Sequence, residues 1–240
     1  MRRIFSSKRQ LAVLLAAAVC VAAFIFSLVG VRSVTASKPS VPSKGDILIL
    51  IDPGHGGEDG GAIGVGNLIE KELNLDISLR LRDVLRLMGY RVRMTRETDV
   101  SLNGRGSSRK SRDLNARLDA INESDVTLCV SIHQNSYSGS GTARGTQVFH
   151  VPDCEKSKLL AECIRHSVKQ RLQPENERAV KAADSSIYIL KHAKNPAVLV
   201  ECAFLSDPRD ALLLSKEASK SDFAFAIAGG IAEYLDSPHS

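Results

Sequence analysis

Several common kinds of site are missing from this sequence. Its five cysteines include no CxxC pair, which argues against a zinc site built from thiolates. Cys129 and Cys202 lie inside apolar runs, and we expect them to be small core residues. Cys154 and Cys163 could pair, although nothing in their spacing requires it. The cysteines therefore predict no functional site.

The glycine-rich stretch IDPGHGGEDGGAIG, residues 51–64, also lacks the features of nucleotide-binding loops. It has no Gly-Lys-Ser/Thr, as a phosphate-binding loop would, and no GxGxxG spacing, as a dinucleotide-binding turn would. The candidate functional residue of this stretch is His55, which lies among glycines and carboxylates.

Acidic residues are absent from the first 44 positions, which carry seven basic residues. The rest of the chain has 25 basic against 27 acidic residues, so the net charge of +5 arises from the N-terminal segment alone. A folded part with about as many acids as bases is not expected to bind nucleic acid.

The N-terminal segment has the pattern of an export signal, because basic residues precede an uncharged apolar run over 11–31. A run of about 20 apolar residues can span a bilayer with its basic flank in the cytoplasm. Small residues at 34–36 would also suit cleavage of a long signal peptide, but such apolar regions are usually shorter, which favours an anchor. We predict a signal or membrane anchor over 1–32, a linker rich in proline and serine over 33–45, and an exported domain over 46–238.

After the linker, short apolar runs alternate with amphipathic stretches. This alternation predicts a single three-layer α/β domain, in which helices cover both faces of a mainly parallel, twisted sheet. The expected strands are 47–51, 90–95, 126–132, 145–151 and 197–201, and the expected helices lie near 70–88, 113–123, 155–172 and 220–235.

Three ionisable residues are expected at one edge of this sheet. His55 follows the first strand, His133 follows the strand VTLCVSI, and Glu201 closes the strand AVLVE. Because ligands bind beyond the carboxyl ends of the strands in such sheets, we expect these side chains to converge there.

Glu70 is a fourth candidate, because it is in phase with the buried stripe of the first helix. Glu72 instead begins a face that becomes charged, so we expect it to point to solvent. A carboxylate on the core side of a helix needs a positive partner, although a role at the helix dipole is the alternative. Helical steps of three or four residues from Glu70 reach Leu73, Ile77, Leu81, Val84 and Met88.

Two imidazoles and one carboxylate from separate elements form the donor set of a catalytic zinc site, which leaves a fourth position for water. His55, Glu70 and His133 are therefore the candidate metal ligands, and Glu201 is the candidate general base and acid. We expect the glycines to leave room for substrate near the metal. We also expect Asp52 to accept a hydrogen bond from a ligating histidine.

The basic, serine-rich segment NGRGSSRKSRDLNARL, residues 103–118, is expected to be a solvated loop that leads into a helix capped by Ser111 or Asp113. The alternative is a functional one, in which the segment contacts an anionic wall polymer or a partner protein.

Four of these segments, in this order and spacing, resemble the zinc-dependent N-acetylmuramoyl-L-alanine amidases of the family 3 type. They are IDPGHGG, the helix that begins at Glu70, VSIHQNS and PAVLVECAFLSDP, and the likeness runs from about 47 to 235. The resemblance implies that His55, Glu70 and His133 bind zinc and that Glu201 is catalytic. It also implies hydrolysis of the amide between N-acetylmuramic acid and L-alanine in peptidoglycan.

Within that family, the short tethered layout resembles the germination-specific amidases of endospore formers. The resemblance implies a role in spore cortex maturation with muramic-δ-lactam formation, a place between the forespore membranes, and a possible activating protein or lipoprotein. Some relatives carry an inserted helix that blocks the metal. Only 67 residues separate His133 from Glu201, and we expect no such helix here.

Two other functions remain open at this point. One is a peptidoglycan-binding or activator protein that keeps the amidase fold without catalysis. Such a protein should have lost at least one of the four candidate residues, and this chain has all four. The other is a zinc amidohydrolase or peptidase that acts on peptides without glycan, because zinc chemistry does not name the substrate.

Overall fold

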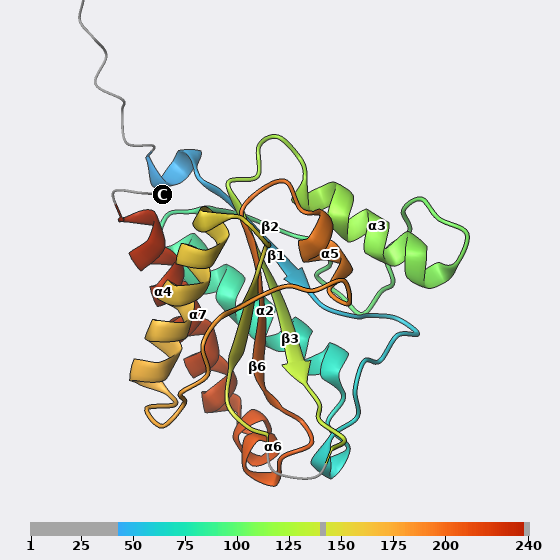
Figure 1. Ribbon diagram of the computed structural model, residues 1–240, viewed down its shortest axis with the longest axis vertical. Helices are drawn as coiled ribbons and strands as arrows, with labels where there is room; N and C mark the ends of the chain where they lie inside the picture. Colours follow the sequence, from blue (N-terminus) through green and yellow to red (C-terminus); the bar gives the residue numbers. More distant parts are fainter. Residues whose placement is uncertain (1–42, 140–142, 238–240) are drawn as a thin grey trace, which may run out of the picture. The chain divides into compact units, whose positions relative to one another are not determined.

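The computed structural model describes residues 43–139 and 143–237 (Figure 1). The predicted anchor, 1–32, and nearly all of the predicted linker lie outside these ranges. Within them, no helix combines the length and the apolar character needed to cross a membrane.

The described part of the chain folds around one six-stranded sheet. Its strand order is β2-β1-β3-β6-β4-β5, and β4 runs antiparallel to β6 while the other neighbouring strands are parallel. The strands are β1 (Leu48–Pro53), β2 (Arg91–Met94), β3 (Leu128–Asn135), β4 (Gln147–His150), β5 (Lys181–Ala182) and β6 (Ala197–Phe204). The predicted α/β domain with a mainly parallel sheet is thus confirmed.

Helices cover both faces of this sheet (Figure 1). One face is covered by α2 (Glu70–Leu87), α4 (Glu155–Arg171) and α7 (Glu217–Leu235), and the other by α3 (Arg109–Ile121) and the short α5 (Tyr188–His192). The remaining elements are α6 (Pro208–Leu214) and two 3-10 turns, η1 (Lys44–Asp46) and η2 (Val65–Asn67).

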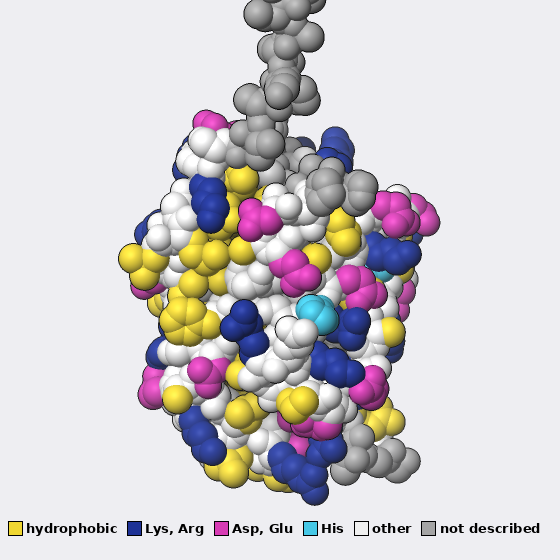
Figure 2. Space-filling view, turned by 90° about the vertical axis from the view of Figure 1, so that its left-hand side faces the viewer, with side chains coloured by type: hydrophobic (Ala, Val, Ile, Leu, Met, Phe, Trp, Pro, Cys, Tyr) yellow, Lys and Arg dark blue, Asp and Glu magenta, His cyan; other side chains and the backbone are white. Residues whose placement is uncertain are grey.

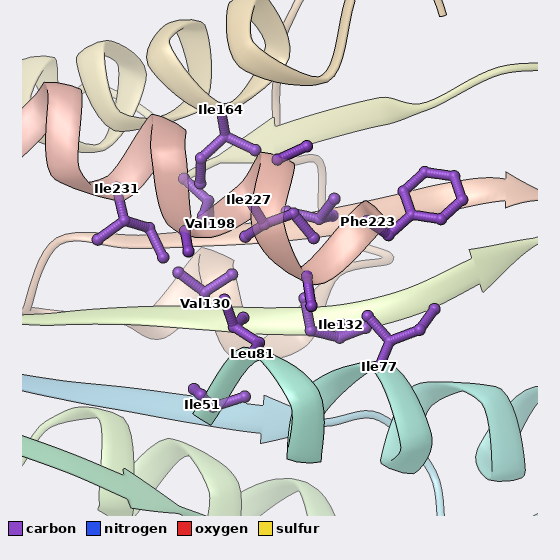
Figure 3. Close-up of a cluster of buried hydrophobic side chains, with 14 of the residues drawn as sticks. Ile51, Ile77, Leu81, Val130, Ile132, Ile164, Val198, Phe223, Ile227 and Ile231 are labelled. Atoms are coloured by element: carbon purple, nitrogen blue, oxygen red, sulfur yellow. The ribbon is translucent and has the colours of Figure 1, made fainter. Parts of the chain in front are cut away.

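The larger hydrophobic core lies between the sheet and helices α2, α4 and α7. Figure 3 shows Ile77 and Leu81 of α2 facing Val130 and Ile132 of β3. All four of these side chains are fully buried. Alternate residues of each strand point to opposite faces, so β3 gives this core every second side chain. Burial of apolar surface here supplies most of the driving force for folding.

The intervening strand residues point to the α3 and α5 face, where the hydrophobic cluster is smaller. Cys129 and Leu199 join this cluster, and His133 and Glu201 are in phase with them further along β3 and β6. The sequence predicted that His133 directly follows its strand and that Glu201 is the last residue of its strand. They lie instead inside the strands and project from this face of the sheet, before the strands end.

The basic segment forms a helix earlier than expected. Helix α3 begins at Arg109, and its N-cap is Ser108, whose side chain accepts a hydrogen bond from the backbone N–H of Ser111. The predicted caps, Ser111 and Asp113, are therefore wrong. Ser111 completes a capping box from inside the first turn, because its hydroxyl accepts from the N–H of Ser108.

The side of the molecule on which α4 and α7 lie carries charges of both signs (Figure 2). Lysine and arginine side chains are interspersed with acidic ones, and hydrophobic side chains form scattered groups. The four described cysteines are free, including Cys154 and Cys163. Cys129 and Cys202 are fully buried, as predicted.

Candidate metal centre

Three candidate ligands come together at the carboxyl end of β1 and β3. Oε1 of Glu70 lies 3.2 Å from Nε2 of His55 and 3.0 Å from Nδ1 of His133. The two imidazole rings meet edge to face, with centroids 5.1 Å apart. One possible ligand atom from each of the three side chains lies within 4.8 Å of the others. Side chains distant in sequence thus offer two nitrogens and one carboxylate to a single point.

Glu70 occupies the first position of α2 and is only 4% exposed. Its Oε2 accepts a hydrogen bond from the N–H of Ala62, and its Oε1 accepts from the N–H of Gln134. Glu72, two residues later, is exposed. The helical phase that separated the two carboxylates in the sequence is therefore confirmed, and the positive partners expected for Glu70 are the two histidines.

Electrostatics at this cluster favour the charged forms of Glu70 and His55. Burial opposes ionisation of Glu70, but hydrogen bonds with His133 and His55 outweigh it and hold the pKa of Glu70 well below its usual range. Burial likewise opposes protonation of His55, but Glu70 and Asp59 raise the pKa of His55 to about 9. The pocket thus stabilises positive charge beside the Glu70 carboxylate, as a cation site must.

His55 is held in an unusual backbone conformation. Its φ angle is +59°, a left-handed value that costs free energy for a residue with a side chain. Arg117 donates from Nη2 to the carbonyl of His55 at 2.7 Å and from Nη1 to that of Pro53 at 2.8 Å. Arg96 donates from Nε to Pro53 and from Nη2 to Gly54. Two buried arginines therefore fix the backbone around the histidine.

Asp52 has a different role from the one predicted. Its carboxylate accepts hydrogen bonds from Thr95, Arg117 and Ser131 at 2.6 to 2.8 Å. It therefore orients Arg117, which in turn holds the His55 backbone, and it makes no hydrogen bond with a histidine of the described residues. The carboxylate beside a candidate ligand is Asp59, whose Oδ2 lies 2.8 Å from Nδ1 of His55. Its spacing, four residues after His55 in the glycine stretch, was the signal available in the sequence.

Two glycines make room for the candidate ligands. A Cβ atom on Gly54 would lie 2.2 Å from the imidazole ring of His133. A Cβ atom on Gly61, where φ is +67°, would lie 2.5 Å from Oε2 of Glu70. Both distances are far below van der Waals contact, so close approach of the backbone to the ligand side chains requires glycine at these two positions.

Glu201 stands beside this cluster but outside the three-residue set. It is the register partner of His133 in the neighbouring parallel strand. Its Oε2 is buried and has no hydrogen-bond partner among residues 43–139 and 143–237. Burial raises the pKa of Glu201 to about 7. A carboxyl group with this pKa can both accept and donate a proton near neutral pH.

These residues open into one cavity of about 580 Å³. His55, His133 and Glu201 line it on the sheet side, and α3 and the start of α5 form the opposite wall. No residue of α4 lines the cavity in the part of the chain that the structure describes, because α4 packs on the other face of the sheet. Buried Oε2 of Glu201 and the mixed nitrogen and oxygen donor set fit a catalytic metal.

Comparison with known proteins identifies relatives of this arrangement. A model of the N-acetylmuramoyl-L-alanine amidase family matches residues 49–233. The germination-specific N-acetylmuramoyl-L-alanine amidase of Bacillus subtilis (strain 168) is 37% identical over 200 residues, which are 82% of this chain and 82% of the relative.

Solved structures agree. The CwlD amidase from Clostridioides difficile, in complex with the GerS lipoprotein, has a TM-score of 0.74 at 37% identity, over 79% of this chain and 98% of that chain. An N-acetylmuramoyl-L-alanine amidase from Clostridium difficile 630 has a TM-score of 0.72 at 28% identity, over 82% of this chain and all of that chain. With a family match over most of its length, this chain belongs to the N-acetylmuramoyl-L-alanine amidases.

Proposed function

We propose that the protein is a zinc enzyme that hydrolyses the amide between the lactyl group of N-acetylmuramic acid and L-alanine in peptidoglycan. The observation that carries this proposal is the cavity in which His55, Glu70 and His133 converge next to Glu201. Membership of the amidase family supplies the substrate class.

His55, Glu70 and His133 would hold the metal. Two imidazole nitrogens and one carboxylate match the donor preference of catalytic zinc, which commonly keeps a further position for water or substrate. When bound, zinc lowers the pKa of water and polarises a carbonyl group. Arg96 and Arg117 support this set by fixing the backbone on either side of His55.

Glu201 would move the proton. Its buried carboxylate takes a proton from the attacking water and returns it to the nitrogen of the departing L-alanine. The pKa of about 7 suits both steps, and Oε2 has no competing hydrogen bond from the part of the chain that the structure describes. The L-alanyl peptide then leaves with a neutral amine, and the lactyl carbonyl becomes a carboxylic acid, which loses its proton to solvent.

We propose a role in spore cortex maturation, where such hydrolysis prepares muramic acid for δ-lactam formation. The germination-specific relative from Bacillus subtilis supports this role. The lipoprotein bound to the Clostridioides difficile relative supports a partner of that kind. Residues 1–32 would anchor or export the chain, 33–45 would tether it, and the domain over 46–238 would act outside the cytoplasm.

The test is mass spectrometry of peptidoglycan treated with the purified protein. We expect free peptides that begin with L-alanine when zinc is present, and none with a chelator. Glu201→Ala should abolish release while zinc stays bound, whereas Glu70→Ala should lose zinc as well. Glu72→Ala, on the exposed side of the same helix turn, is the matched control and should keep both zinc and activity.

Loss of zinc from Glu201→Ala would show that ligand and base have been confused. Zinc binding without any peptide release would favour the peptidoglycan-binding or activator function. Release of other peptides, cut within the peptide rather than before L-alanine, would favour a peptidase.

A further inference from the structure

The cavity at the candidate metal centre continues into a groove between α3 and α5. A neighbouring depression of about 330 Å³ shares Lys110, Leu114 and Tyr188 with the cavity. The hydroxyl of Tyr188 donates a hydrogen bond to Oδ1 of Asn115 at 3.0 Å, which joins the start of α5 to α3. The two spaces therefore form one path that leads away from Glu201 along the basic helix.

Among the described residues, the charged side chains along this path are paired except for Glu201 and the cation Lys110. Lys110 is exposed, and it has no hydrogen bond or ion pair within residues 43–139 and 143–237. Every other basic residue that lines the cavity has an acidic partner, and the acidic residues other than Glu201 have basic ones. The pairs are Glu58 with Arg109, Asp59 with His55, and Asp113 with Arg117, while His133 faces Glu70.

The position of Lys110 is not explained by stability of the helix. It is the second residue of α3, whose first turn contains no acidic residue. Positive charge near a helix N-terminus opposes the helix dipole and costs free energy. The cation is therefore kept at an unfavourable place on its helix, at the point where the cavity meets the groove.

We propose that Lys110 binds a carboxylate of the peptide on the leaving side of the scissile amide and so determines which stem peptides are cleaved. This inference rests on the proposed amidase function. The carboxylate is the first one beyond L-alanine, the α-carboxylate of a γ-linked glutamyl residue, because Lys110 lines the same cavity as His133 and Glu201. Leu114 and Tyr188 provide the apolar wall along which the peptide lies.

Two muramoyl peptides that differ in one charge test this. Both are N-acetylmuramoyl-L-alanyl-γ-D-glutamyl-L-lysine amides, with the glutamyl α-carboxyl group free in one and an amide in the other. The affinity of each is measured by competition against peptide release from peptidoglycan, so a probe that is not cleaved is still informative.

We expect the wild type to bind the acidic probe about five- to tenfold more tightly than the amide, the range of a partly exposed charged contact. Lys110→Gln should remove this preference, and Lys110→Glu should reverse it. Lys156→Gln is the matched control, because Lys156 is also an exposed second residue of a helix, α4, but lies on the other face of the sheet. It should behave as wild type.

Equal binding of both probes by the wild type, or an equal loss for both in Lys110→Gln, would overturn the inference. Zinc content and thermal unfolding of each variant separate a binding effect from damage to the fold. Failure of the proposed function would look different, since the wild type would then release no L-alanine peptides from peptidoglycan at all.

Discussion

The two faces of the sheet differ in what they bury. Towards α2, α4 and α7 the strands present apolar side chains, such as Val130 and Val198. Towards α3 and α5 the same strands present a smaller apolar cluster at one end, and Asp52, His133 and Glu201 at the other. One alternating pattern thus produces a dry face and a polar one.

The dry face therefore serves mainly the stability of the fold, whereas the polar face carries residues of the candidate site. Among the apolar side chains of the dry face, an unpaired buried charge would have nothing to offset its desolvation. The polar face keeps its charges by pairing them, as with Asp52 and Arg117, but buried Oε2 of Glu201 has no hydrogen-bond partner in the described part of the chain. Substitutions on the two faces should therefore fail in different ways.

Phe223→Ala should damage the dry face alone. Phe223 of α7 is fully buried in the larger core, so its removal should lower the free energy of unfolding by about 3 to 5 kcal/mol. Zinc affinity of the folded protein should not change. Phe225, two residues later and 60% exposed, supplies the control, since Phe225→Ala should cost little. Urea unfolding measures the free energy of unfolding, and zinc titration measures the affinity for zinc. Equal losses of unfolding free energy in both variants would contradict the assignment of Phe223 to the buried core.

Arg117→Met should destabilise the polar face and should also lower the affinity for zinc. The change leaves Asp52 charged, buried and without its main counterion, which should cost about 3 to 5 kcal/mol. It also removes the donor to the carbonyl of His55, so zinc affinity should fall. Arg105→Met is the control, because the Arg105 to Asp119 pair is exposed. An unchanged zinc affinity in Arg117→Met would contradict the proposed support of His55.

Local patterns in the sequence predicted much of this arrangement. The phase of Glu70 follows from helical spacing within one segment, and His133 and Glu201 follow from strands that end in polar residues. The contacts of Arg117 could not be predicted in this way, because Asp52 lies 65 residues away in the chain. Periodicity says which face a residue occupies but not which distant charge meets it there. For the same reason Asp52 was given the wrong partner.

Short elements were also missed. Strand β5 has two residues and α5 has five, too few for a period to be recognised. Their absence from the expected fold hid the wall that α5 forms opposite the sheet. The groove beside Lys110 could therefore be seen only once the chain was folded, although the basic segment itself was recognised as a candidate contact.

Because of Glu201, the stability of the polar face should depend on pH. Burial raises its pKa from the ordinary 4.5 to about 7, so the folded state binds this proton more tightly than the unfolded state. Its contribution to stability is complete below pH 4.5 and is lost as the pH rises through 7. In zinc-free protein, Glu201→Gln should therefore gain on the order of 3 kcal/mol over the wild type across this window. Chemical unfolding at several pH values measures it, and parallel curves for both proteins would exclude a raised pKa.

The smallest effect is expected at the outer edge of the His55 loop. Asp99 accepts hydrogen bonds from the N–H of Gly57 at 2.7 Å and from Lys71 at 2.6 Å, and Lys71 also donates to the carbonyl of Gly57. Because Asp99 is half exposed, Asp99→Ala should cost less than about 1 kcal/mol of stability. Part of that loss falls on the loop that carries His55, so zinc affinity should weaken by less than about fivefold.

Asp119→Ala separates the two consequences. Asp119 is exposed to the same degree and also pairs with a basic side chain, Arg105, but that pair joins α3 to the loop before it and does not touch the glycine stretch. The two variants should therefore lose similar stability, and only Asp99→Ala should lose zinc affinity. Equal zinc affinities would mean that the buried arginines alone hold His55, and that the polar face is supported from within the sheet rather than from its rim.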